Sequence, residues 1–139
     1  MEKKILIVQS IPKWLNMIRG HLKEKSLSLI EGVNIVFTDS FDHAVDIVPT
    51  NCELLVISSE EFHDNLSIHK SEPKMANVLK DSNALAILLK QKNSHAIIHV
   101  FSEYAPKEVQ NIDGYIAKVR GDEYIGLEKI AELIKEFLK

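Results

Sequence analysis

Five short runs of apolar residues recur along the chain, and they constrain its fold more than any other feature. They lie at residues 4–8 (KILIV), 33–37, 54–57, 96–101 and 114–117. A continuous apolar run bounded by polar residues is typical of a strand that is covered on both faces, as in a parallel sheet. The sequence therefore predicts five short strands in one buried sheet.

Helical patterns separate several of these runs. Pro12 stands in the first turn of the pattern that follows the first run. The apolar stripe of that helix would consist of Trp14, Leu15, Ile18 and Leu22. Asp39 and Ser40 are candidate N-caps for a second helix, which Pro49 would end. A last helix would bury Leu127, Ile130, Leu133, Ile134, Phe137 and Leu138.

Strands that alternate with helices favour right-handed parallel crossovers. We therefore expect a three-layer α/β/α sandwich, with a five-stranded parallel sheet in the flavodoxin-like order 2-1-3-4-5. The 139 residues, of which 45% are hydrophobic, suffice for a single domain over residues 1–139. In this topology a binding site lies at the carboxyl ends of the strands.

Charge and composition disfavour several classes of partner. The chain has 17 basic and 20 acidic residues, with no basic block that could follow a phosphate backbone, so no nucleic-acid partner is expected. We see no signal peptide and no apolar run of roughly 18 residues, so we expect no membrane partner and a cytoplasmic location. The only cysteine, Cys52, is expected to be a buried filler.

The residues at the expected strand ends are Gln9 and Ser10, Ser58 and Ser59, Ser102 and Glu103, and Lys118. With this pattern the chain resembles a response-regulator receiver (CheY-like) domain over nearly its whole length. In that family the fourth strand ends in Ser or Thr and the fifth in a lysine, which Ser102 and Lys118 match. The resemblance also makes Tyr115 a candidate switch aromatic, although ordinary packing is the alternative.

The departures from the family fall on its chemistry. Receivers hold Mg²⁺ with two acidic residues after the first strand, and they accept phosphate on an aspartate after the third. This chain has Gln9, Ser10 and Ser58 at those positions. A serine cannot form the acyl phosphate, and neutral oxygens do not offset the dehydration of Mg²⁺. We therefore expect a degenerate pocket with no metal, no cofactor and no enzymatic activity. Val119 replaces the family's proline, so the bond after Lys118 should be trans.

Two length changes accompany these departures. Ser102 follows Ser58 by 44 positions, which is more than a helix and a strand need and predicts an insertion after strand 3. An extra loop and a short helix would begin near Pro73. Conversely, Pro106 to Asn111 leaves room for only about one or two turns of a shortened helix 4.

The leading interpretation is a pseudo-receiver, a non-catalytic signalling domain that binds another protein without phosphorylation. Its candidate interaction surface includes Phe62, Leu66 and Ile68 of the insertion, which could instead fold back onto the domain. Pairing of two copies into a homodimer through the last helix is a further option.

The alternative interpretation is a sensor of a small anionic ligand. Gln9, Ser58, Ser102 and Lys118 would then form a neutral-to-positive pocket. Lys118 could instead pair with a carboxylate such as Glu60 or Glu103, because a partly buried ammonium needs a partner.

Overall fold

A computed structural model describes residues 2–25, 34–62, 81–106 and 109–139. The strands are β1 (Lys3–Val8), β2 (Ile35–Thr38), β3 (Glu53–Ser58), β4 (Ala96–Ser102) and β5 (Gly114–Ala117). They form one parallel sheet in the order β2-β1-β3-β4-β5. The predicted fold class and strand order are confirmed.

The described helices are α1 (Pro12–Glu24), α2 (Phe41–Ile47), α4 (Ser82–Lys92) and α5 (Glu123–Leu138). Pro12 occupies the first turn of α1, as predicted. Of the two candidate caps of α2, Ser40 is the N-cap, and its Oγ accepts a hydrogen bond from the His43 N–H at 3.2 Å. Asp81 caps α4 in the same way through the Ala84 N–H.

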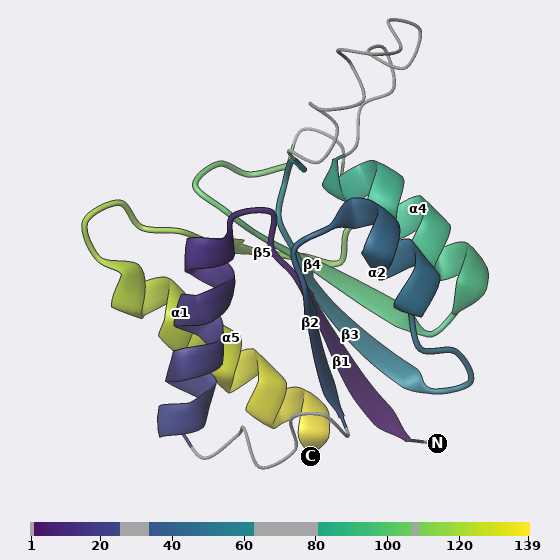
Figure 1. The fold of residues 1–139 in the computed structure, drawn as a ribbon, viewed down its shortest axis with the longest axis horizontal. Helices are drawn as coiled ribbons and strands as arrows, with labels where there is room; N and C mark the ends of the chain where they lie inside the picture. Colours follow the sequence, from purple (N-terminus) through teal and green to yellow (C-terminus); the bar gives the residue numbers. More distant parts are fainter. Residues whose placement is uncertain (1, 26–33, 63–80, 107–108) are drawn as a thin grey trace, which may run out of the picture.

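The helices cover the sheet in two layers, with α1 and α5 on one face and α2 and α4 on the other (Figure 1). Each face has its own apolar core because alternate residues of the central strands point to opposite sides. Along β1, for example, Leu6 belongs to the core beneath α2 and α4, and Ile7 to the core beneath α1 and α5. This arrangement is the three-layer sandwich expected from the sequence.

The connection from β4 to β5 differs from the expected shortened helix. Its described residues, 103–106 and 109–113, form bends and a turn but no helix. Asp113 closes this connection, because its Oδ2 accepts a hydrogen bond from the Ile98 N–H at 2.8 Å and pairs with Lys90 Nζ at 3.0 Å. One carboxylate thus joins β4 to α4 at the edge of the sheet.

Other expectations concern boundaries and the backbone. The start of the second strand at Val33 and the short helix near Pro73 lie outside the described residues. No cis peptide bond occurs among the described residues, so the Lys118–Val119 bond is trans, as expected. Within the described ranges, no helix has the length and hydrophobicity that a membrane span requires.

Candidate functional site

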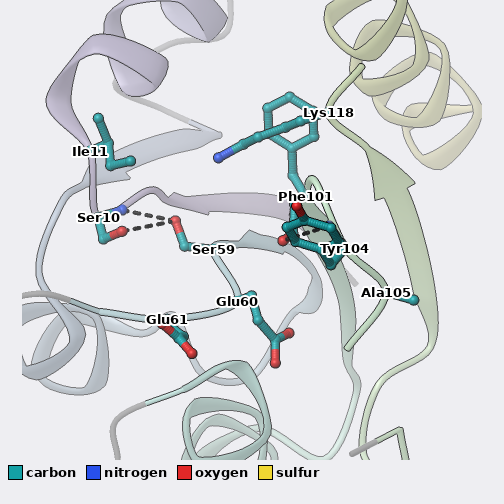
Figure 2. Close-up of a pocket in the computed structure, with 10 residues that line it drawn as sticks. Ser10, Ile11, Ser59, Glu60, Glu61, Phe101, Tyr104, Ala105 and Lys118 are labelled. Atoms are coloured by element: carbon teal, nitrogen blue, oxygen red, sulfur yellow. Dashed lines mark hydrogen bonds between the residues drawn. The ribbon is translucent and has the colours of Figure 1, made fainter. Parts of the chain in front are cut away.

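A cavity of about 360 Å³ lies at the carboxyl ends of β1, β3, β4 and β5 (Figure 2). This is where a doubly wound sheet places its binding sites. Its described lining consists of Ser10 and Ile11 after β1, Ser59, Glu60 and Glu61 after β3, Phe101 and Ser102 on β4, Tyr104 and Ala105 after it, and Lys118 after β5. Three of the five predicted pocket residues, Ser10, Ser102 and Lys118, line the cavity.

The other two, Gln9 and Ser58, are fully buried and do not line it. The Ser58 hydroxyl donates to the Ser59 carbonyl at 2.8 Å, and Gln9 Nε2 donates to the Ile57 carbonyl at 3.5 Å. Ser59 lies at the cavity wall instead, because successive side chains of an extended chain point to opposite sides. The expectation that Ser58 and Gln9 form the pocket surface is therefore wrong.

The serine hydroxyls at the wall bond to one another. Ser59 Oγ accepts from the Ser10 N–H at 2.9 Å and from the Ser10 hydroxyl at 3.4 Å, and it donates to Gln9 Oε1 at 3.3 Å. This network joins the ends of β1 and β3 with neutral groups (Figure 2). It occupies the place where the family resemblance implies charged oxygens.

The Lys118 amine lies beside two aromatic rings that pack edge-on against each other, with centroids 5.3 Å apart. Its Nζ is 4.9 Å from the centroid of the Trp14 ring and 5.0 Å from that of Phe101. Burial lowers the pKa of this amine to about 8, although the Glu103 charge raises it in part. The rings supply cation–π attraction to the charged form.

The expected pairing of Lys118 with Glu60 or Glu103 does not form. Glu103 pairs with Arg120 at 3.3 Å, and Glu60 Oε2 accepts from the Ser82 hydroxyl at 2.8 Å. Within the described part of the chain, Lys118 Nζ has no carboxylate within ion-pair distance. Contact with Trp14 and Phe101 takes the place of the predicted ion pair.

Two carboxylates, those of Glu60 and Glu61, also line the cavity. The predicted neutral-to-positive pocket is therefore wrong, because two carboxylates and one amine line the cavity. Sequence reasoning treated Glu60 only as a partner for Lys118 and did not single out Glu61. The signal that could have found both is their position directly after Ser59 at a strand end.

Tyr115 lies on β5 and is connected to the cavity through Ser102, which lines it. Its hydroxyl donates to the Ser102 carbonyl at 3.0 Å, and burial raises the pKa of the phenol. The same carbonyl accepts from the Lys118 N–H at 2.8 Å. Tyr115 therefore contacts the strand end that holds Ser102, and its function as a switch stays a prediction.

Of the predicted surface residues, Phe62 folds back into the domain. It is 4% exposed and packs edge-on against Phe41, with ring centroids 5.5 Å apart. Because it is buried in the core beneath α2 and α4, it does not belong to an exposed surface. Leu66 and Ile68 lie outside the described residues.

Cys52 does not line the cavity. Cys52 is buried, and burial raises the pKa of its thiol, so it fits the predicted role of a filler. Among the residues that the structure describes, no three His, Cys, Asp or Glu side chains are grouped so that they could hold a metal ion.

No protein-family model and no curated protein matches the sequence at a significant level. The fold, however, matches solved response-regulator structures over nearly the full length of both chains. The receiver domain of the hybrid histidine kinase CckA has a TM-score of 0.63 at 15% identity and covers 98% of this chain and 99% of its own. The response regulator TrrA of Thermotoga maritima, solved with Mg²⁺ and BeF, has a TM-score of 0.64 at 18% identity, covering 97% and 98%.

The chemotaxis protein CheY4 of Vibrio cholerae gives a TM-score of 0.63 at 11% identity, covering 99% of both chains. At such low identity these likenesses establish the fold and leave the function open. The chain has the fold of a receiver domain.

Proposed function

We propose that this chain, which has the fold of response-regulator receiver domains, is a non-catalytic signalling domain that binds another protein without phosphorylation. The observation that carries the proposal is the state of Gln9 and Ser58. Both are fully buried and hydrogen-bonded to the backbone at the strand ends where a receiver has carboxylates. Neither side chain can form an acyl phosphate.

Glu60 and Glu61 are the acidic residues nearest to these strand ends in the sequence, but their arrangement supports a structural role. Glu60 accepts a hydrogen bond from Ser82 in the first turn of α4. Glu61 forms an isolated antiparallel bridge with Asp81, the cap of α4. Both residues thus contribute to the junction between β3 and α4.

The segment between β4 and β5 exposes apolar side chains that a protein partner can contact. Tyr104 is 74% exposed and Val109 is 61% exposed, and Tyr115 is also exposed. Large apolar side chains that are exposed on one segment favour a protein contact. The partner is a different protein or a second copy of this chain. Nucleic acid and membrane are not expected partners, and the cytoplasm is the expected location.

The proposal is tested by amide NMR spectra recorded before and after addition of Mg²⁺ with beryllofluoride, a mimic of the acyl phosphate. We expect unchanged peaks, while TrrA, which was solved with Mg²⁺ and BeF, serves as the positive control. Shifts clustered at Ser58, Ser102 and Lys118 would contradict the proposal that the domain acts without phosphorylation. Inorganic phosphate alone forms a third arm, in which shifts at Lys118 would favour the anion sensor instead.

The partner surface is tested with a photo-crosslinking amino acid at Tyr104 or Val109. Asp46 is the matched control because it is exposed on α2, an element outside the proposed surface. We expect specific crosslinked species only from the first two positions. Equal crosslinking from Asp46 would place the contact elsewhere, and crosslinked homodimers would identify the partner as a second copy.

A further inference from the structure

The amine of Lys118 is the chemically distinctive group of the cavity. Its neighbours are the rings of Trp14 and Phe101, and no described residue gives it an ion pair. Figure 2 shows the Lys118 side chain crossing the Phe101 ring, with its amine on the side of Ser10 and Ile11. Burial of an amine without a carboxylate within ion-pair distance increases the share of its neutral form, which is the nucleophilic one.

The carboxylates in the cavity wall affect which ligands can approach the Lys118 amine. An anion that approached Lys118 would also enter the field of Glu60 and Glu61. An uncharged electrophile avoids this cost. The wall also presents Ile11 and Tyr104, which suit an apolar or aromatic group.

We propose that Lys118 is a reactive amine that binds an uncharged aldehyde in this cavity as an imine. The volume of about 360 Å³ lies in the range of small-molecule sites. This property goes beyond the proposed function and does not depend on it. Whether Lys118 reacts with an aldehyde does not decide whether the domain binds a partner without phosphorylation.

The reaction balances without an oxidant or a reductant. The lone pair of neutral Nζ attacks the carbonyl carbon, and the electron pair of the C=O π bond moves to oxygen, which takes a proton. Nitrogen loses a proton to give a carbinolamine. Loss of water then forms the C=N bond, so the products are the imine and one water molecule. A protonated imine has the same charge as the ammonium group, so the charge of the cavity is unchanged.

The test uses benzaldehyde as the uncharged probe, with cyanoborohydride to reduce the imine to a stable amine, followed by peptide mass spectrometry. At pH 7.5, a pKa of about 8 leaves roughly a quarter of Lys118 neutral, against roughly one in a thousand for an ordinary lysine. A lower pKa also weakens the nucleophile, as it does for thiols, so we expect Lys118 to react roughly tenfold faster than the other lysines.

Two variants complete the test. Lys118→Arg keeps the positive charge but has no primary amine, and we expect it to lose the fast phase of labelling. Lys90→Arg changes a lysine outside the cavity and should retain the fast phase of labelling. In wild type, the labelling rate of Lys118 should level off above pH 8 and saturate with aldehyde concentration. Even labelling of all lysines, or a rate that stays linear in aldehyde, would overturn the proposal. Circular dichroism of each variant checks that it is folded.

Discussion

No carboxylate of the described residues lies within ion-pair distance of Lys118, and the Glu103 charge offsets the burial of its amine only in part. The folded pKa of Lys118, about 8, lies below the value of about 10.4 for an unfolded chain. Between these two values the unfolded chain binds more protons, so stability should rise with pH through this window. Below pH 8 the cost of burying the ammonium is fully present.

Lys118→Met should therefore stabilise the protein at pH 7, because the thioether keeps the contacts with Trp14 and Phe101 without a charge. The gain should be on the order of 1 kcal/mol, since water still reaches part of this side chain. Urea unfolding at pH 7, 8, 9 and 10 measures it. The advantage should shrink as pH rises above 8, and a variant that is less stable at every pH would contradict the desolvation of Lys118.

Gly126 and Gly20 form a matched pair of helical glycines. A Cβ at Gly126 would lie 2.7 Å from Phe101 Cε1 and 3.0 Å from the Ala117 carbonyl, whereas one at Gly20 meets nothing within 4 Å. Overpacking typically costs about 1–3 kcal/mol, more than the roughly 0.5–1 kcal/mol that alanine gains over glycine in a helix. Gly126→Ala should lower the free energy of unfolding and Gly20→Ala should raise it. A stabilised Gly126→Ala would mean that Phe101 can move aside.

Among the secondary-structure elements, the link between β4 and β5 depends on one carboxylate. Burial alone would raise the pKa of Asp113, but the Ile98 N–H and the Lys90 ammonium lower it below its ordinary value. A carboxyl group with a lowered folded pKa contributes stability above its unfolded pKa of about 3.9, and this contribution is lost as pH falls through the lower folded value. The element junction is therefore sensitive to acid.

Asp113→Asn should lose less than about 1 kcal/mol at pH 7, because the Lys90 pair is partly exposed and the amide oxygen can still accept from Ile98. Between pH 4 and pH 2 the variant should lose stability less steeply than wild type. Glu136→Gln is the control, since it removes only an exposed pair with Lys139. Parallel acid titrations of all three proteins would contradict a role for Asp113 at this junction.

The elements were predictable where local chemistry decides them. Apolar runs predicted the strands. Pro12 and Ser40 mark helix starts because proline has no N–H that would need a partner in the first turn, and the serine hydroxyl accepts a hydrogen bond from a first-turn N–H. The site was less predictable. A shift of one position at the end of β3 exchanges Ser58 for Ser59 at the cavity wall, and the ends of strands are the part of a fold that sequence patterns locate least well. The aromatic neighbours of Lys118 come from α1 and β4, so only the folded chain brings them together.

At the scale of the whole molecule, the sheet contributes side chains to both apolar cores. Leu6 and Ile7 are adjacent in β1 but belong to different cores, so loss of either core exposes a face of the same strands. The two helices of either layer cannot bury their apolar stripes without that sheet. We therefore expect the two faces to unfold together.

Leu85→Ala tests this coupling from the face opposite the only tryptophan. Leu85 is a fully buried residue of α4 in the core between α2, α4 and the sheet, while Trp14 packs against the core beneath α1 and α5. The cavity should cost about 2–5 kcal/mol. If the domain is two-state, the urea midpoint from Trp14 fluorescence should fall as far as that from far-UV circular dichroism. Ile87→Ala, exposed on the same helix, should move both midpoints much less. A fluorescence midpoint that stayed at the wild-type value would mean that the two faces unfold independently.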